Sequence, residues 1–421
     1  MSDLLILPEH ADELRSLPLP ADQAYSYVYP FQKRQGEQVC FRISPTAGGH
    51  RIETSYYIGV DWIGYGSHAV YVQPKMNAGD YQTDYLQMLA IALRHPDVSA
   101  HTGDLFEIKY AQPSIEIGRE QDLLTPLLAV QFLSVVKALV QRGLKKSYYR
   151  VERNLNGRIK GKINRTGTIQ HNILKNKSLH TLCVFDEFGL NSPENRLLKK
   201  TLLFVQQYLS TMRHFQAEAY VTDTLRFVLP AFTGVSENAD PHEWRHPKKN
   251  ALYGEYEEGI RLAKLILQRF GFHLSNIQTA GTMKTPPFWI DMSRLFELYV
   301  LGLLKDRFPG PKEVLYHYTV SGNELDFVLN TPDYKMVIDA KYKPKYEHSF
   351  GNDDIRQVSG YARSKFVYKH LGKTEQDVID CLIVYPDRNL KAGDIENRDL
   401  KAEKIGAYVG FYKLGVGLPV L

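Results

Sequence analysis

The sequence of 421 residues contains only three cysteines, Cys40, Cys183 and Cys381. No two of them form a C-x-x-C pair, which argues against a disulfide framework and against a zinc site built on thiolates. We therefore expect a reducing, cytoplasmic environment. The N-terminal MSDLLILPEHADEL combines early acidic residues with a short apolar run, so we expect no signal peptide. No stretch reaches the roughly 18 uncharged apolar residues that a transmembrane helix requires.

A loop that binds nucleoside triphosphates is also missing from the sequence. Gly372-Lys373-Thr374 matches the end of a Walker A motif, but Val367 stands where the first glycine of that motif would be. The complete motif is needed because its backbone amides surround the phosphates. We therefore expect that this chain does not hydrolyse GTP or ATP, and that a nucleotide-driven step would depend on a partner protein.

The overall composition is that of an ordinary globular protein. Apolar residues make up 43% of the chain and charged residues 24%. The length predicts about two or three domains with a sizeable core. The formal net charge is +5, because 52 Lys and Arg face 47 Asp and Glu. Such a small excess is compatible with a nucleic-acid partner but does not predict one.

The pattern of residues predicts a multi-domain α+β protein. Residues 1–118 are rich in alternating strand patterns such as RIETSYYIGV and HAVYVQPKM, and we expect a β-rich N-terminal domain there. Residues 119–280 are predicted to be mainly helical, with long helices at about 121–145 and 251–269. The segment TAGTMKTPPFW is a candidate linker.

Residues 281–421 predict an α/β domain with a mixed sheet flanked by helices, in the order α-β-β-β-α-β-β. Its first helix is DMSRLFELYVLGLLKDRF, for which Asp291 is a suitable N-cap. EVLYHYTV, NELDFVLN, KMVIDAKY, CLIVYP and KIGAYVGFYKL are predicted strands. NDDIRQVSGYARSKFVY is predicted as one helix, capped by Asn352 or Asp353.

Two carboxylates and a lysine interrupt the apolar residues of a predicted hairpin, ELDFVLNTPDYKMVIDAKYKP. Thr331-Pro332-Asp333-Tyr334 is a turn sequence. A hairpin symmetric about that turn pairs Asn330 with Lys335, Leu329 with Met336 and Asp326 with Asp339. The two carboxylates then face each other, with Cβ atoms roughly 5 Å apart. Lys341 lies on the same sheet face about 7 Å along the strand, and Glu324 shares that face.

Opposed carboxylates in a half-buried sheet repel one another unless a proton or a cation lies between them. Mg²⁺ needs one or two carboxylates, with water and substrate phosphates as further ligands. A nearby lysine can position the attacking water or offset charge in the transition state. The pattern therefore suits metal-assisted hydrolysis of a phosphodiester by Mg²⁺, or by Mn²⁺ in its place. The simpler reading is a surface hairpin in which Lys341 forms a salt bridge with Asp339.

The order of elements and the hairpin charges resemble the PD-(D/E)xK nuclease superfamily. The residues that carry this resemblance are Asp326, Asp339, Ala340 and Lys341. Gln357 and Tyr361 are four residues apart on one face of the next predicted helix, and they resemble the Q-x₃-Y signature of the RecB-like branch. Longer segments, from about residue 55 onward, are similar to the McrC family of nuclease subunits: VYVQPKMN, NGRIKGKI, CVFDEFGLNSPENRLLKK and RLFELYV.

The resemblance implies an architecture and site roles. The C-terminal part would cut DNA, while the N-terminal part would dock on a McrB-like AAA+ GTPase hexamer and stimulate it. Asp326 and Asp339 would be metal ligands and Lys341 the catalytic lysine. Gln357 and Tyr361 would orient the site or touch phosphate, unless they only form a helix-packing hydrogen bond. Glu297 resembles an acid that some superfamily members direct at the site, although a salt-bridged helix residue explains it equally well.

A basic stretch in the middle region offers a second contact with DNA. Its cations are Arg158, Lys160, Lys162, Arg165, Lys175 and Lys177. Such a run can follow a phosphate backbone, but it can equally be a solvated face. No segment suggests a module that reads bases. We therefore expect target recognition to lie in the partner. Double-strand cleavage with a single active site per chain would suggest two copies of this chain, which the sequence alone does not decide.

Two alternatives belong to other classes of function. His242-Glu243-Trp244-Arg245-His246 fits the HExxH pattern of zinc hydrolases, but Pro241 and Pro247 leave room for only about one helical turn. The other alternative is an adaptor that activates the AAA+ partner without cutting DNA. The complete set of Asp326, Asp339 and Lys341 argues against an adaptor.

Overall fold

The computed structural model describes residues 3–20, 22–29, 38–64, 68–74, 83–95, 98, 101–102, 104–118, 121–210, 219–239, 254–269, 282–320, 323–343, 350–393 and 395–420. The chain divides into two compact units, one formed by Met1–Gln131 with Gln278–Leu421 and the other by Phe132–Ile277. The segments predicted as the first and third domains therefore belong to one unit. The mixture of sheets and helices is that of a multi-domain α+β protein.

The N-terminal part of the first unit is rich in strands, as predicted. In the described residues, one sheet has the order β1 (Asp3–Pro8), β7 (His68–Gln73), β6 (Tyr57–Ile63), β14 (Phe288–Asp291) and β8 (Phe106–Ile108). A second sheet has the order β2 (Asp12–Arg15), β5 (Gly49–Thr54), β4 (Val39–Thr46) and β3 (Tyr25–Val28). Alternating apolar residues of both sheets share one core, which includes Phe41, Ile52, Val70 and Trp289.

The predicted linker TAGTMKTPPFW is not a linker in its described part. Its residues form β13 (Thr282–Thr285), which pairs with β9 (Ile115–Gly118), and the start of β14. β14 lies between β6 and β8. Pro286 and Pro287 cannot donate ladder hydrogen bonds, and they mark the break between the two strands. The chain thus completes the N-terminal sheet immediately before it enters the next helix.

The C-terminal part of this unit contains the predicted mixed sheet. Its strands in the described residues have the order β15 (Val314–Val320), β16 (Asn323–Asn330), β17 (Lys335–Ala340), β18 (Asp380–Pro386), β20 (Phe411–Val416) and β19 (Glu403–Lys404). β15, β16 and β17 form an antiparallel meander, whereas β17, β18 and β20 are parallel. The segment KIGAYVGFYKL was predicted as one strand, but it contains the end of β19, a turn and β20.

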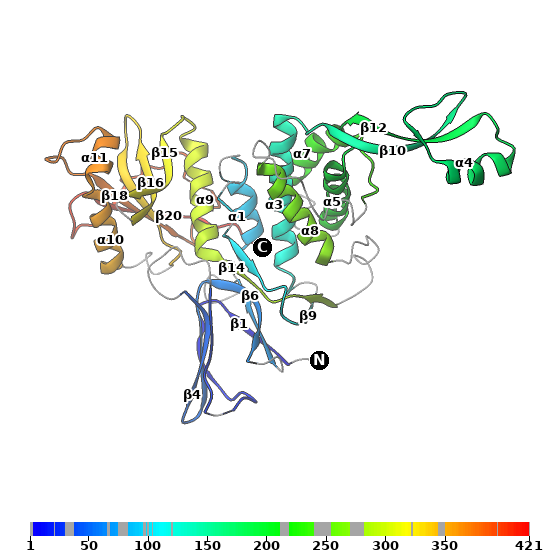
Figure 1. The fold of residues 1–421 in the computed structure, drawn as a ribbon. Helices are drawn as coiled ribbons and strands as arrows, with labels where there is room; N and C mark the ends of the chain where they lie inside the picture. Colours follow the sequence, from blue (N-terminus) through cyan, green and yellow to red (C-terminus); the bar gives the residue numbers. More distant parts are fainter. Residues whose placement is uncertain are drawn as a thin grey trace. The chain divides into compact units, whose positions relative to one another are not determined.

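Helices cover both faces of the mixed sheet (Figure 1). α9 (Met292–Arg307) lies on one face, and its N-cap is Asp291, as predicted, because the Asp291 carboxylate accepts from the Arg294 amide. α10 (Asn352–Ala362) and α11 (Lys365–Leu371) pack on the other face. The prediction of one continuous helix here was wrong, and the N-cap is Gly351 without a side-chain cap. α1 (Tyr85–Ala92), which was not predicted, packs against α9.

The second unit is built mainly from helices in its described residues. They include most of α3 (Leu124–Arg142), together with α5 (Pro193–Ser210), α7 (Ala219–Val228), η3 (Leu229–Phe232) and α8 (Gly254–Arg269). From these helices extends a long antiparallel pair, β10 (Ser147–Asn156) and β12 (His180–Gly189), with β11 (Lys162–Ile163) on β12. α4 (Arg165–His171) and η2 (Ile173–Lys175) lie toward the far end of this pair (Figure 1). We call residues 147–189 the arm.

α3 (Leu124–Arg142) is long and apolar enough to cross a membrane by length and composition, although Lys137 interrupts its apolar run, so it contains no uncharged apolar stretch of about 18 residues. However, 78% of its apolar window is buried inside the protein. The buried side chains of α3 include the polar residues Thr125, Gln131 and Ser134. These features are those of a core helix, which passes the same test.

Candidate active site

The hairpin of β16 and β17 has the predicted register. Leu329 pairs with Met336 and Asn330 pairs with Lys335, and the ladder is described as far as Phe327 with Ile338. One step further along this register, Asp326 would face Asp339. At this point the Asp326 carboxylate accepts a hydrogen bond from the Ala340 amide at 2.9 Å. The symmetric turn therefore brings both carboxylates to the same end of the hairpin.

Asp339 and Lys341 form an ion pair in a buried setting. Lys341 Nζ lies 2.8 Å from Asp339 Oδ2, and the Asp339 side chain is 1% exposed. The side chains share a sheet face because they are two residues apart on an extended chain. Burial lowers the pKa of Lys341, but the carboxylates of Asp339 and Asp326 outweigh that effect, so its pKa is raised above the usual value. Lys341 is therefore an ammonium group at neutral pH.

α10 supplies the next contacts of Lys341. The Lys341 ammonium donates to Gln357 Oε1 at 3.2 Å, and the Gln357 amide donates to the Tyr361 hydroxyl at 2.7 Å. The predicted helix face thus reaches the lysine through Gln357. Asp354, on the same helix, lies 4.0 Å from Lys341 Nζ and 3.1 Å from Lys343 Nζ. Asp354 was not predicted as a site residue, although its position three residues before Gln357 places it on the same helix face.

Glu297 belongs to a separate group of buried charges. Its carboxylate lies 3.2 Å from the Arg294 guanidinium and 2.6 Å from His317 Nε2. His317 has a φ of 50° in β15, and its neighbours Tyr316 and Tyr318 pair with β16 on either side of Asp326. Burial is the main reason that the pKa of Tyr316 is raised, and the carboxylates of Glu297 and Asp326 raise it further. Glu297 is therefore engaged with Arg294 and His317.

The donor set suits a hard divalent cation. Asp326 and Asp339 offer two carboxylates at one end of the hairpin, which is the number that Mg²⁺ takes from a protein when water and phosphate complete its shell. In the described residues, no group of three or more His, Cys, Asp or Glu side chains has the arrangement of a metal cage. A cation held by Asp326 and Asp339 would therefore take its other ligands from solvent or substrate.

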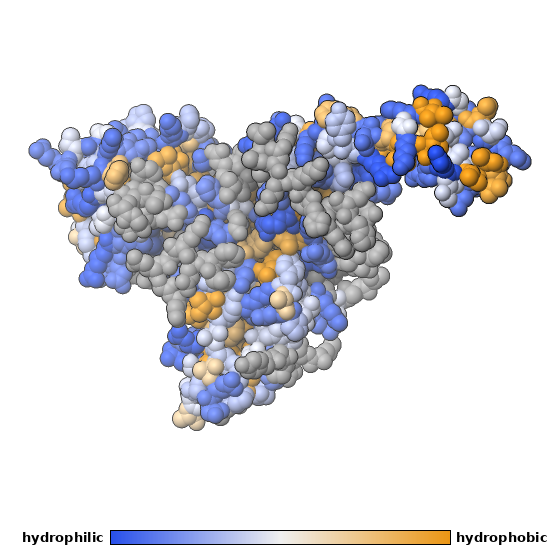
Figure 2. Space-filling view, viewed as in Figure 1, coloured by the Kyte–Doolittle hydropathy of each residue, from blue (hydrophilic) through white to orange (hydrophobic). Residues whose placement is uncertain are grey.

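The predicted cations of the basic stretch lie on the arm and are exposed: Arg158, Lys160, Lys162, Arg165, Lys175 and Lys177. Lys160 lies 3.8 Å from Glu187 and over the ring of Phe185. Exposed apolar side chains stand among them, as Figure 2 shows along the arm. These residues are Tyr148, Ile159, Ile163, Ile169, Ile173, Leu174, Leu179 and Phe188. A surface that mixes cations with exposed apolar groups is typical of contact with a macromolecule.

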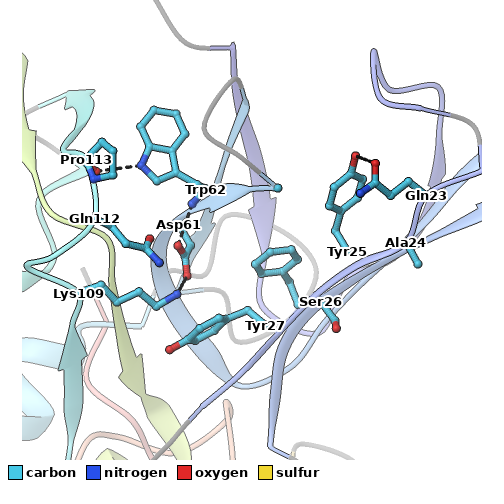
Figure 3. Close-up of a pocket in the computed structure, with 12 residues that line it drawn as sticks. Gln23, Ala24, Tyr25, Ser26, Tyr27, Asp61, Trp62, Lys109, Gln112 and Pro113 are labelled. Carbon is cyan, nitrogen blue, oxygen red and sulfur yellow. Dashed lines mark hydrogen bonds and ion pairs between the residues drawn. The ribbon is translucent and has the colours of Figure 1, made fainter.

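A cavity of about 640 Å³ lies in the N-terminal part of the first unit (Figure 3). Asp61 is its buried charged group, and it forms an ion pair with Lys109 and accepts from the Trp289 indole at 2.8 Å. Lys109 also lies over the ring of Tyr27. The indole of Trp62 donates to the Pro113 carbonyl at 2.9 Å. Because these groups bind one another, we assign the cluster a structural role in holding β3, β6, β14 and the chain after β8 together.

Three further features of the sequence are the HExxH segment, Glu324 and the Walker A-like Gly372-Lys373-Thr374. The HExxH segment, His242–His246, and the side chain of Glu324 lie outside the described residues. Gly372 adopts a left-handed conformation with a φ of 61° and ends α11. The sequence Gly372-Lys373-Thr374 is thus explained as a helix C-cap and the turn that follows it.

Comparison with known proteins identifies the family. The model described as "McrBC 5-methylcytosine restriction system component" matches residues 52–386. A structure of a half-complex of Thermococcus gammatolerans McrB AAA+ hexamers with bound McrC aligns with 98% of this chain and 94% of its own, at 16% identity and a TM-score of 0.40. A second structure, the McrBC complex of the same organism, aligns with 74% of this chain and 89% of its own, at 16% identity and a TM-score of 0.30. No curated protein matches the chain. With the family model covering well over half of its length, this chain belongs to the McrBC family of 5-methylcytosine restriction system components.

Proposed function

We propose that this chain is the DNA endonuclease subunit of a McrBC-type defence system, with a PD-(D/E)xK active site. The proposal is carried by one observation, the buried pair of Asp339 and Lys341 at 2.8 Å, at the hairpin end that Asp326 also reaches. A salt bridge on a solvated surface would not need a carboxylate that is 1% exposed. The hydrogen bond from Lys341 to Gln357, at 3.2 Å, connects this pair to α10.

Asp326 and Asp339 would hold Mg²⁺, or Mn²⁺ in its place. When bound, the cation supplies Lewis acidity and lowers the pKa of a coordinated water. Lys341, whose ammonium lies 2.8 Å from Asp339, would stabilise the negative charge that develops on the scissile phosphate. Gln357 would hold that ammonium in place.

The proposed partner is a McrB-like AAA+ GTPase hexamer. Its support comes from the family, and from the chain's own lack of a complete Walker A motif, since Val367 replaces the required glycine. The partner would recognise modified or foreign DNA, and this chain would stimulate its GTP hydrolysis. One active site per chain implies that two copies act together when both strands are cut.

The first test is plasmid cleavage by the chain together with a McrB-like AAA+ GTPase. Cleavage is expected only when the partner, GTP and Mg²⁺ are all present, because the site needs both a cation and activation in trans. EDTA should abolish cleavage, and excess Mn²⁺ should restore it. Cleavage that persists in EDTA would contradict a metal-dependent nuclease. Loss of activity in His246→Ala, with zinc detected by metal analysis, would favour the HExxH alternative.

We also propose that the arm cations contact the DNA backbone. The double variant Lys162→Gln, Arg165→Gln should bind DNA more weakly, and the slope of log affinity against log salt should fall by about 2, one for each lost phosphate contact. The measurement is fluorescence anisotropy with a labelled duplex at several salt concentrations. The control is Lys365→Gln on α11, which removes an exposed charge that pairs with Glu375. An unchanged slope in the double variant would show that these two cations form only a solvated face.

A further inference from the structure

The residue after Lys341 is buried on the opposite side of the sheet. Lys341 donates its amide to the Val384 carbonyl at 2.8 Å, and Lys343 donates its amide back to the Lys341 carbonyl at 2.7 Å. These two hydrogen bonds form a tight turn centred on Tyr342, directly after β17. Lys341 contacts Gln357 on α10, whereas the Tyr342 ring packs against Phe296 on α9, so the two side chains lie on opposite faces of the sheet. The conformation of this turn therefore sets the direction of the Lys341 side chain.

The Tyr342 side chain is held at both its ring and its hydroxyl. Its ring lies 5.6 Å from that of Phe296 on α9, and its hydroxyl donates to Glu9 Oε1 at 2.9 Å. Tyr342 is 2% exposed and Glu9 is 3% exposed. Burial, and then the Glu9 carboxylate, raise the pKa of Tyr342 well above its usual value, so its hydroxyl remains a donor. A charge-assisted hydrogen bond in such a dry setting is strong and directional.

Glu9 is fixed in turn by the N-terminal strands. It follows β1, and its amide donates to the Gln73 carbonyl at 3.1 Å. The next residue, His10, has a φ of 56°, and its amide donates to the Ser55 carbonyl at 3.0 Å. A left-handed conformation is uncommon for residues other than glycine, and it persists only where the surroundings enforce it. The position of the Glu9 carboxylate is therefore determined by the N-terminal sheets.

We propose that Glu9 and Tyr342 are positioning residues, which hold the turn after β17 so that the Lys341 ammonium lies against Asp339. The inference rests on the proposed function in one respect, the role of Lys341 in cleavage. Glu9 and Tyr342 are 333 residues apart in the sequence, so the hydrogen bond ties the geometry of the nuclease centre to the N-terminal sheet. The same turn directs Lys343 to Asp354, which is 3.1 Å away.

The test uses the full chain with its AAA+ partner, GTP and Mg²⁺, and measures kcat and KM for DNA. Tyr342→Phe and Glu9→Ala should each lower kcat by about 10- to 100-fold, the range for a misplaced catalytic group, with KM for DNA unchanged. Glu9→Gln keeps an acceptor for the Tyr342 hydroxyl and should retain most of the activity. The double variant Tyr342→Phe, Glu9→Ala should be no slower than the worse single variant, because both changes remove one interaction.

Tyr85→Phe is the matched control for the loss of a buried tyrosine hydroxyl. Tyr85 donates to the Leu123 carbonyl at 2.9 Å and lies on α1, away from the hairpin of β16 and β17. It should keep wild-type kcat even if its thermal unfolding midpoint falls as far as that of Tyr342→Phe. Wild-type kcat in Tyr342→Phe and Glu9→Ala would overturn the proposal. An equal loss of kcat in Tyr85→Phe would also overturn it, because the effect would then be one of folding.

Hydrogen exchange separates this inference from the nuclease proposal. In Glu9→Ala, deuterium uptake should rise at the amides of Lys341 and Lys343, whose acceptors define the turn, and should stay unchanged in Glu9→Gln. This measurement needs no cleavage. If the wild-type complex cuts no DNA, the proposed function fails while the exchange result still decides whether Glu9 holds the turn. Unchanged exchange in Glu9→Ala would overturn the positioning role.

Discussion

Asp339→Asn is expected to lower DNA cleavage by about three orders of magnitude or more, the effect of losing roughly 4 kcal/mol of transition-state stabilisation. The change is nearly isosteric, so it preserves the packing of a side chain that is 1% exposed. It removes the negative charge that would bind the cation and that now pairs with Lys341. The measurement is linearisation of a plasmid by the complex, alongside GTP hydrolysis by the partner. Stimulation of GTP hydrolysis should remain at the wild-type level.

The control for this variant is Asp353→Asn, the same chemical change on α10. The Asp353 side chain is 97% exposed and lies 3.4 Å from Arg356, so its replacement should leave cleavage unchanged. Two outcomes of the Asp339 experiment would contradict the proposed role of this residue. Full cleavage by Asp339→Asn would refute the proposed active site and leave the adaptor as the better account. A joint loss of cleavage and of GTPase stimulation, with a lowered unfolding midpoint, would assign Asp339 a structural role.

Asp61→Ala is expected to destabilise the first unit by about 3–5 kcal/mol, the range for breaking a buried ion pair from one side. Asp61 is 2% exposed and its partner Lys109 is largely buried, so the change leaves an ammonium without its counter-charge. It also removes the acceptor of the Trp289 indole at 2.8 Å. The measurement is urea unfolding followed by tryptophan fluorescence, because Trp62 and Trp289 both lie beside Asp61.

Asp12→Ala provides the comparison, since Asp12 binds the Arg51 guanidinium through both oxygens, at 2.9 and 2.8 Å, on an exposed strand pair. Exposed pairs contribute little to stability, because water and salt screen them. We expect no resolved change in the unfolding midpoint of this variant. A similarly small change for Asp61→Ala would show that the cluster around the cavity does not hold the N-terminal sheets together.

Much of the candidate site could be predicted from the sequence because its geometry is local. A two-strand hairpin with a turn at Pro332 and Asp333 has only one register that keeps Leu329 and Met336 on the buried face, and this register is observed. The cap at Asp291 likewise depends on its immediate neighbours. The spacing of Gln357 and Tyr361 placed both on one helix face, and the contact to Lys341 follows from that face.

Predictions that depended on distant partners were less successful. The segment around Thr282–Asp291 was taken for a linker, since its two prolines and short strands have little pattern of their own, yet it pairs with β9, β6 and β8. The division into three successive domains missed this return of the chain to the N-terminal sheet. Non-local strand pairing leaves only weak marks on local periodicity, because the partner strand supplies the hydrogen bonds and the burial.

The sequence by itself determined the hairpin, its two carboxylates and the lysine on their face, since these follow from the period of a strand and the chemistry of a turn. Only the tertiary structure decided how those charges are set. It buried Asp339, raised the pKa of Lys341 and engaged Glu297 with Arg294 and His317. It also brought Glu9 to Tyr342, a contact that no local pattern encodes. The physical reason is that burial and electrostatic coupling depend on which distant segments pack together, and packing is a property of the whole chain.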